Sequence, residues 1–329
     1  MKNIFLFIIL CMFCACTPSQ NEPKIKLIFD TDMAPDYDDV GALAILHALA
    51  DSGEVSILAT VSSNKCETAV PCIDVINTYF GRPDIPIGAV RGDGAPDQST
   101  WHSGMRWTDE LPKQFPHSIK KTSDSEDALK IYRKILSEQP DNSVTIVSIG
   151  FFTNLQNLLL SQGDEYSPLS GKELVHKKVK QLVSMAGQFP SGKEFNVYID
   201  PKASQFIVNE WPTPILLSGF EIGEAVLTGK RLVESDIQNN PIIETFRMCL
   251  AQDNPEGRES WDETAVLAAV RGEANYFDSV QGRMIVADDG CNSWENDPNG
   301  PHAYLTFKMP VEQLTAEIEH LMMHQPMKK

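Results

Sequence analysis

Positive charge is scarce in this sequence, and several other features are absent from it. The 329 residues include 28 Lys and Arg against 45 Asp and Glu, which gives a formal net charge of -17. Phosphate backbones and anionic lipid headgroups repel such a chain, so a nucleic acid polymer is excluded as a partner. There is no internal repeat and no low-complexity segment. Because hydrophobic residues make up 42% of the chain and charged residues only 22%, the chain can form a substantial core, and disorder is excluded.

Cysteine is also sparse in the part of the chain that we expect to fold. Of the seven Cys residues, three lie among the first 16 residues, and the others are Cys66, Cys72, Cys249 and Cys291. These four form neither a Cys-x-x-Cys pair nor a Cys and His cluster with the spacing of a zinc site. A short-loop disulfide between Cys66 and Cys72 and a pair of free buried thiols fit the sequence equally well. We therefore assign no chemistry to cysteine.

The first 15 residues have the pattern of a secretion signal. Lys2 precedes an apolar run over 4–10 that is too short to span a bilayer, and the chain becomes polar at Thr17. Ala15 directly before Cys16 resembles a bacterial lipoprotein processing site, which predicts a lipidated Cys16 and a polar tether over 16–23. An ordinary cleaved signal peptide is the alternative. We expect an exported protein, periplasmic or anchored in the outer membrane of a bacterium, whose membrane contact is confined to this N-terminal lipid.

Strands and helices alternate along the rest of the chain. Apolar runs bounded by turn residues indicate strands, and apolar residues at helical spacing indicate helices. The predicted strands cover 25–29, 55–61, 85–90, 144–149, 181–185, 214–217, 282–286 and 302–307, and the predicted helices 40–50, 70–79, 128–138, 155–160 and 264–270. This order predicts an α/β fold with an open, mainly parallel (mixed) sheet and helices on both faces. No internal boundary is evident, so we expect a single domain over 24–329.

The segment after the first predicted strand is the most acidic part of the chain. It holds five carboxylates within ten residues, on Asp30, Asp32, Asp36, Asp38 and Asp39. Such crowding is unfavourable unless a cation neutralises it, and oxygen ligands favour a hard ion, Ca²⁺ or Mg²⁺. One or two Asp would be enough to cap a helix, so capping does not explain all five. An EF-hand is excluded, because position 12 counted from Asp30 is Gly41, where such a loop needs Glu.

Two enzyme families place Asp-x-Asp directly after a strand. In phosphotransferases of the haloacid dehalogenase type the fifth residue from the first Asp is normally Thr or Val, whereas here it is Ala34. In the nucleoside hydrolase family a short turn follows, and then Asp-Asp at the head of a helix, as in Asp38-Asp39. The segment resembles the second family, in the variant whose turn is two residues longer. The pair Asp288-Asp289 keeps the phosphatase as a distant alternative.

Further segments resemble the nucleoside hydrolase family in order along the chain. Asn64 follows the second strand, where the family has a substrate-facing Asn, and Gly150 to Asn154 is similar to its Gly-Pro-Leu-Thr-Asn segment. Glu194-Phe195-Asn196, followed by Asp200-Pro201 and Ala203, is similar to the run that binds the sugar hydroxyls. Trp261-Asp262 opens an apolar helix at the place of the final calcium Asp. The matches span most of the chain, and they imply a Rossmann-like fold and a nucleosidase.

The resemblance implies a calcium site. Its ligands would be the side chains of Asp32, Asp39 and Asp262 and the backbone carbonyl of Thr153. The ion would also take up the ribose 2′ and 3′ hydroxyls and hold a water at attack distance. Asp32, next to that water, would be the general base.

The resemblance also implies a set of sugar contacts. Asp38, Glu194 and Asn196 would hold the ribose hydroxyls, with help from Asn64. Gln188 stands near the place of a further sugar-binding Asn and can donate and accept hydrogen bonds in the same way. A negative site suits this reaction, because cleavage of an N-ribosidic bond passes through an oxocarbenium-like sugar.

The residue before the final calcium Asp indicates the base. Broad-specificity members of the family have His-Asp there, whereas this chain has Trp261-Asp262 and lacks that acid for the leaving group. Purine-preferring members carry a stacking Trp at this place, and Trp101 and Trp107 are candidates for the opposite face of the base. The alternative is that Trp261 is simply a core aromatic.

The histidines of the chain are expected to be structural. His102, His117 and His302 lie in polar segments, where solvated or capping roles are the usual ones, and His47 lies within the first predicted helix. If protonation of the leaving group needs an imidazole, His102 and His302 are the residues to mutate first.

The sequence therefore predicts an exported, Ca²⁺-dependent hydrolase that splits purine ribonucleosides into base and ribose, as in purine salvage. Its partner is a small neutral nucleoside, and the resemblance is compatible with a homodimer or a homotetramer. The competing hypothesis is a lipoprotein that binds a ribosyl ligand through Ca²⁺ without turnover. The presence of Asp32 favours the enzyme, because binding alone needs no base.

Overall fold

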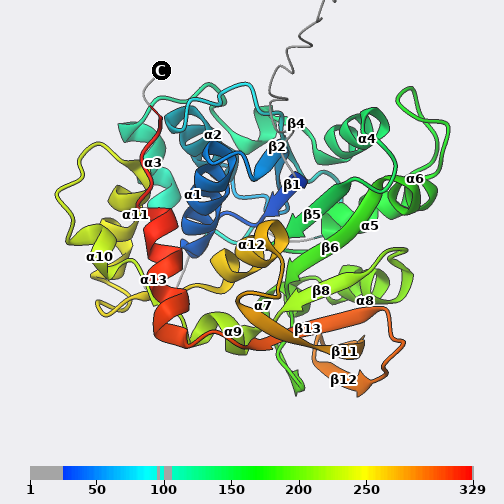
Figure 1. Cartoon of the computed structure of the whole chain (residues 1–329). Helices are drawn as coiled ribbons and strands as arrows, with labels where there is room; N and C mark the ends of the chain where they lie inside the picture. Colours follow the sequence, from blue (N-terminus) through cyan, green and yellow to red (C-terminus); the bar gives the residue numbers. More distant parts are fainter. Residues whose placement is uncertain (1–24, 95–96, 100–105, 328–329) are drawn as a thin grey trace, which may run out of the picture.

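One large sheet runs through the molecule. The computed structural model describes residues 25–94, 97–99 and 106–327 (Figure 1). The order of strands across this sheet is β4-β3-β2-β1-β5-β6-β8-β13-β11-β12-β7. Their bounds are β1 Ile25–Thr31, β2 Val55–Ser62, β3 Ile87–Ala89, β4 Glu126–Asp127, β5 Val144–Ser148, β6 Val179–Met185, β7 Ser191–Gly192, β8 Ile215–Ser218, β11 Phe277–Val286, β12 Asn292–Asn296 and β13 His302–Phe307. A separate short ladder joins β9 (Leu227–Thr228) to β10 (Arg258–Glu259).

The sheet is mixed, as predicted. Neighbouring strands from β4 to β13 pair in parallel, whereas β11 pairs antiparallel with β13 and β12, and β12 pairs antiparallel with β7. The central strand β1 lies between β2 and β5, so Asp30 is level with Val61 on one side and Ser148 on the other. Parallel strands end at one edge, where loops from distant parts of the chain meet.

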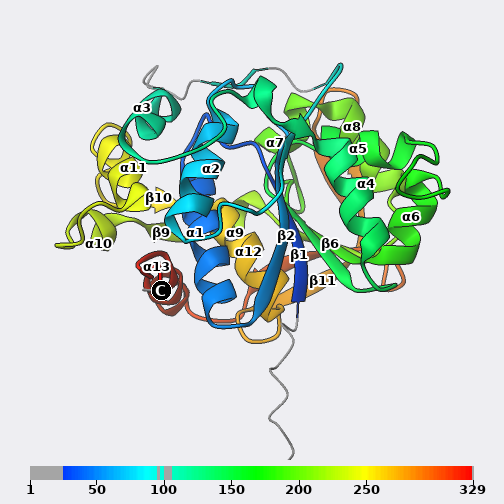
Figure 2. The ribbon, with the colours of Figure 1, turned by 90° about the horizontal axis from the view of Figure 1, so that it is seen from above.

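Helices cover both faces of the sheet. The helices are α1 Asp38–Asp51, α2 Ala69–Tyr79, α3 Trp107–Gln114, α4 Ala128–Glu138, α5 Thr153–Leu160, α6 Gly171–Lys178, α7 Phe195–Ile199, α8 Pro201–Glu210, α9 Phe220–Glu224, α10 Lys230–Val233, α11 Pro241–Leu250, α12 Trp261–Arg271 and α13 Val311–Met322, with a 3₁₀ turn at Thr122–Asp124. Seen from above, α1, α2, α11, α12 and α13 lie on one side and α4, α5, α6 and α8 on the other (Figure 2). Each layer buries its own apolar cluster against the sheet, which fixes the strand ends that carry the site.

Most predicted elements exist with shifted ends. The predicted helix over 128–138 is α4 with the same bounds, whereas α1 begins at Asp38, before the predicted start, because its first-turn carboxylates favour the helix N-terminus. The helices α11 and α13 were not predicted. Cys66 and Cys72 are buried free thiols, so the second of the two alternatives for this pair holds. Within the described ranges, no helix combines the length and the apolarity needed to cross a membrane.

Candidate functional site

A cavity opens where the parallel strands end. Its volume is about 280 Å³, and it receives residues that follow β1, β5, β6 and β8. The described residues that line it are Asp32, Asp36, Asp38, Ile149, Met185, Lys193, Glu194, Phe195, Asn196, Tyr198, Phe220, Trp261 and Asp262. Residues more than 200 positions apart in the sequence thus line the same cavity. This is the usual place of a ligand site in an open parallel sheet, at the carboxyl ends of its strands.

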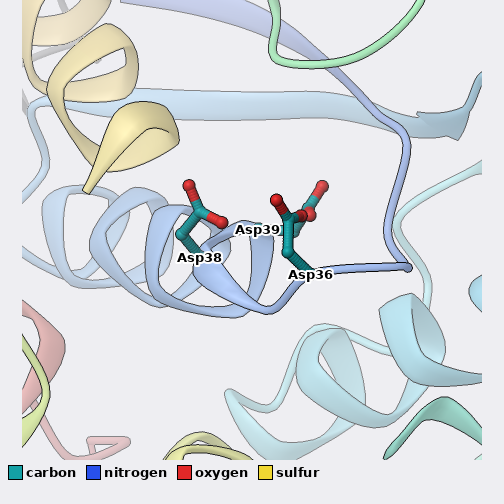
Figure 3. Close-up of side chains that lie close together, drawn as sticks. All are labelled: Asp36, Asp38 and Asp39. Atoms are coloured by element: carbon teal, nitrogen blue, oxygen red, sulfur yellow. The ribbon is translucent and has the colours of Figure 1, made fainter. Parts of the chain in front are cut away.

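The loop between β1 and α1, residues 32–39, forms the acidic side of the cavity. Asp32, Asp38 and Asp39 are at most 4% exposed. Carboxylate oxygens of Asp36, Asp38 and Asp39 lie within 4.8 Å of one another, and Figure 3 shows the three groups pointing to the same side of the loop. Thr31 donates a hydrogen bond from its hydroxyl to Oδ1 of Asp39, whereas Oδ2 of Asp39 is buried and has no hydrogen-bond partner among the described residues.

Burial and mutual repulsion raise the pKa values of Asp32, Asp39 and Asp262 well above the usual range of a carboxyl. Burial, and next the charge of Asp39, raise the pKa of Asp32. Burial and then Asp36 raise the pKa of Asp39, and burial and then Asp38 raise that of Asp262. A cation at this place would remove that repulsion.

The donor set fits a hard divalent cation. Every side chain offered is a carboxylate, and the unpartnered Oδ2 of Asp39 is a ready ligand. Asp32 and Asp262 both line the cavity, and the charge of Asp39 contributes to the raised pKa of each. Thr153, the first residue of α5, is buried, and its hydroxyl donates to Oδ2 of Asp200 at 2.5 Å. Asp36 lies within 4.8 Å of Asp38 and Asp39, but its carboxylate pairs with the guanidinium of Arg258.

The opposite side of the cavity is built around Glu194 and Asn196 at the start of α7. The carboxylate of Glu194 accepts hydrogen bonds from the backbone N–H groups of Asn196 at 2.7 Å, Gly187 at 3.0 Å and Val197 at 3.3 Å. Burial raises the pKa of Glu194 to about 7, although these bonds act in the opposite direction. Asn196 donates from Nδ2 to the carbonyls of Ile149 and Met185, so it ties the ends of β5 and β6 together.

An aromatic wall completes the cavity. The rings of Trp261 and Phe220 lie with their centroids 5.2 Å apart and their planes tilted by 33°. The indole N–H of Trp261 donates to the carbonyl of Phe220 at 2.8 Å, which fixes the orientation of the ring. Trp261 also packs against the apolar cluster of its layer, so it is a core aromatic and a wall of the cavity at once.

Arg258 is the residue of this region that sequence reasoning missed. Its guanidinium is 1% exposed and contacts Asp36 at 2.7 Å, Asp38 at 3.1 Å and Asp253 at 3.4 Å. It lies 5.1 Å from the centre of the Tyr37 ring and 4.9 Å from that of Trp261. The sequence offers one signal for it, a basic residue placed three positions before Trp261-Asp262 in an acidic chain.

Three predicted substrate residues lie elsewhere among the described residues. Asn64 is fully buried, and its amide donates to the carbonyls of Asp32 at 2.9 Å, Ala34 at 2.8 Å and Gln98 at 2.8 Å, so it holds the acidic loop instead of facing the cavity. Trp107 is 2% exposed and donates from its indole to the carbonyls of Pro35 and Asp36. Both side chains thus bind carbonyl groups of the acidic loop, and neither lines the cavity. The reason is that this loop needs donors for its carbonyl groups.

Gln188 and the other predicted candidates do not line the cavity either. The backbone of Gln188 pairs with the side chain of Asn292. His302 is buried at the start of β13, not in a polar loop, and accepts from the N–H of Met284, and burial lowers its pKa to about 4. His47 is buried as well, and burial lowers its pKa to about 3. Trp101, His102 and Cys16 lie outside the described residues.

Comparison with known proteins gives matches over most of the chain. The profile of the family described as inosine-uridine preferring nucleoside hydrolase matches residues 27–313. The pyrimidine-specific ribonucleoside hydrolase RihA of Citrobacter koseri is 32% identical over 212 residues, which are 60% of this chain and 61% of that protein. The alignment thus spans less than two thirds of the length of this relative.

Two solved structures have the same fold. The plant nucleoside hydrolase PpNRh1 superposes with a TM-score of 0.71 at 21% identity, covering 91% of this chain and 99% of the other. The purine-preferring ribonucleoside hydrolase of Gardnerella vaginalis gives a TM-score of 0.68 at 16% identity, covering 90% and 98%. The α/β architecture and its mostly parallel sheet are therefore those of the solved nucleoside hydrolases.

Proposed function

Because this chain belongs to the inosine-uridine preferring nucleoside hydrolase family, we propose that it uses a bound Ca²⁺ ion to hydrolyse the N-glycosidic bond of purine ribonucleosides. The products are the free base and ribose. The observation that carries the proposal is the meeting of three walls at one cavity: the acidic loop with Asp262, the pair Glu194 and Asn196, and the aromatic pair Phe220 and Trp261. The acidic wall would activate water, and the other two walls would bind the ribose and the base.

The acidic wall would provide the attacking water. A calcium ion held by Asp32, Asp39, Asp262 and the carbonyl of Thr153 would supply the positive charge that acidifies a water and lets these carboxylates ionise together. Asp32 lines the cavity and would take the proton of the water as it attacks the anomeric carbon. The remaining negative charge on this side stabilises the oxocarbenium-like sugar.

The other walls would bind the two halves of the substrate. Asp38, Glu194 and Asn196 reach the cavity and offer acceptors and donors for ribose hydroxyls. The wall of Phe220 and Trp261 offers a flat surface for the departing base. No histidine is among the described residues of the lining, so protonation of the base there would come from solvent or from a side chain other than imidazole.

The test is release of ribose from a nucleoside panel by the protein without its first 15 residues. Inosine, guanosine, adenosine, uridine and cytidine are compared with Ca²⁺ and with a chelator. We expect purine cleavage that the chelator abolishes and that Asp32→Asn lowers by about 10³-fold or more. Asp278→Asn, the same change at an exposed aspartate, is the matched control and should retain full activity. Saturable binding of nucleoside without release in the parent protein would support the binding lipoprotein instead.

A pyrimidine preference is the second candidate. It is favoured by the similarity to RihA of Citrobacter koseri, which is named as a pyrimidine-specific ribonucleoside hydrolase. The wide aromatic wall favours the purine, because the larger base buries more surface against Trp261. A higher kcat/KM for uridine than for inosine would decide for the second candidate.

Export with a lipid anchor is part of the proposal. It is supported by the signal-like residues 1–15 and by Ala15-Cys16. Growth of the expressing bacterium with labelled palmitate should label the full chain and not Cys16→Ser. Release of an unlabelled protein into the periplasm would leave the ordinary signal peptide as the answer.

A further inference from the structure

Arg258 divides the carboxylates of the acidic loop into two groups. We propose that it is a positioning residue that keeps Asp36 and Asp38 away from the cation, so that Asp39 with Asp32 and Asp262 binds the ion and Asp38 remains for the sugar. This inference rests on the proposed function, because it concerns the cation and the sugar of that site. It does not follow from the pattern of acidic residues alone, in which all the loop carboxylates are equivalent.

The contacts with Arg258 divide the carboxylates of the acidic loop into two groups. Arg258 holds Oδ2 of Asp36 with Nη2 at 2.7 Å, and it holds Oδ1 of Asp38 with Nη2 at 3.1 Å and Nε at 3.3 Å. Asp39 differs from both, because its buried Oδ2 has no hydrogen-bond partner within the part of the chain that the structure describes. Yet oxygens of Asp36 and Asp38 lie within 4.8 Å of those of Asp39, close enough to share a cation with it. The ion pairs with the guanidinium of Arg258 therefore distinguish Asp36 and Asp38 from Asp39.

Arg258 is itself held rigidly. It belongs to β10, which pairs with β9 at Thr228, and its guanidinium packs on the rings of Tyr37 and Trp261. The hydroxyl of Tyr37 donates to Asp253, which also contacts Arg258. A planar, permanently charged group between two rings cannot follow the carboxylates toward a cation. Asp36 and Asp38 therefore stay on the side of Arg258.

Removal of this charge has a predictable sign. In Arg258→Gln, Asp36 and Asp38 lose their partner and add negative charge beside the cation, so we expect Ca²⁺ to bind at least about tenfold more tightly. Asp38 is then drawn to the ion, so KM for the nucleoside rises more than kcat falls. A merely structural role predicts the opposite sign for the metal, because a disordered loop binds Ca²⁺ more weakly.

The experiment is calorimetric titration of the chelator-treated, full-length mature protein with Ca²⁺. The parent, Arg258→Gln, Arg258→Lys and the exposed-site control Arg283→Gln are compared. The expected result is tighter binding in Arg258→Gln alone, with Arg258→Lys and Arg283→Gln within about twofold of the parent. Unchanged or weaker binding in Arg258→Gln overturns the inference. Failure of the parent to bind Ca²⁺ overturns the proposed function and this inference together, whereas parent binding without the shift overturns this inference alone.

Two further variants keep the test informative if Arg258→Gln does not fold. Asp36→Asn leaves the guanidinium with one anion fewer and removes a negative charge near the ion, so it should weaken Ca²⁺ binding by about tenfold. Asp36→Asn combined with Arg258→Gln removes both charges of one ion pair and should return the affinity to near that of the parent. Loss of Ca²⁺ binding in Asp36→Asn as complete as in Asp39→Asn contradicts the division, because it would make Asp36 a ligand of the ion.

Discussion

The two sides of the cavity bury carboxylates in different ways. On one side Glu194 receives three backbone N–H groups, so its charge is met by the protein itself. On the other, Asp39 has one oxygen without a hydrogen-bond partner among the residues that the structure describes, and Asp32, Asp39 and Asp262 repel one another. Backbone hydrogen bonds stabilise the carboxylate of Glu194, whereas the carboxylates of the acidic side need a cation to offset their repulsion. The difference explains why we assign the cation to the acidic loop and the sugar to both sides.

The largest expected effect comes from Asp39→Asn. It removes the unpartnered ligand, so Ca²⁺ binding and ribose release should be lost, with kcat/KM lowered by about 10³-fold or more. In chelator at pH 8 the same variant should melt at a higher temperature than the parent, because mutual repulsion is relieved. Calorimetry, ribose release and thermal melting measure these three results. A lower melting temperature in chelator would show that the acidic loop does not need an ion.

A smaller loss is expected from Glu194→Gln. The amide replaces one acceptor by a donor that faces a backbone N–H, which costs about 1–3 kcal/mol of stability and loosens the start of α7. We expect kcat/KM to fall by about 100-fold while the Ca²⁺ affinity stays the same. Parallel titration and kinetics test this pair of results. A large fall in Ca²⁺ affinity would erase the distinction between the two sides.

The aromatic wall should matter for the base and not for the ion. Trp261→Leu removes the stacking surface, and base stacking on an aromatic residue contributes about 1–3 kcal/mol, so KM for inosine should rise by about tenfold or more. Trp261→Phe should recover most of this loss. Quenching of tryptophan fluorescence by inosine should disappear in both variants. No change in purine cleavage would leave Trp261 as a core aromatic only.

The smallest expected effect is on the pH dependence of stability. Burial, and next the charge of Asp38, raise the pKa of Asp36 from its ordinary value of 3.8 to about 7. A carboxyl whose pKa is raised by folding contributes stability that is present below its unfolded pKa and lost as pH rises through its folded value. In chelator the melting temperature should therefore fall between about pH 4 and pH 7. Ca²⁺ should raise it more at pH 8 than at pH 5, since ligands must be deprotonated to bind. A flat profile in chelator would contradict the repulsion.

Much of this architecture could be predicted from local sequence. The acidic loop follows β1, and Glu194, Asn196, Trp261 and Asp262 line one cavity because each occurs at a strand end or a helix start, where pattern and position coincide. The resemblance to the family was confirmed. The sheet order through β13 was not predicted, since pairing between distant strands leaves no local signal.

The errors have a common physical cause. Asn64 and Trp107 are polar or amphipathic residues next to the site, and the sequence does not reveal that the carbonyl groups of the acidic loop need donors. Arg258 was missed for the complementary reason. An isolated arginine in an acidic chain is usually a surface residue, and its burial depends on four acidic neighbours supplied by two segments of the fold.

The contacts of Asn64 bear on how this protein can be re-engineered. Its side chain joins the main chain at Asp32 and Ala34 to the main chain at Gln98, accepting from the N–H of Gln98 and donating to its carbonyl. Only backbone atoms of position 98 take part in these bonds, so they depend on the path of the main chain there and not on the identity of its side chain. A library that changes the identity of residue 98 should leave these bonds intact. One that inserts or deletes residues there would pull on Asp32 itself.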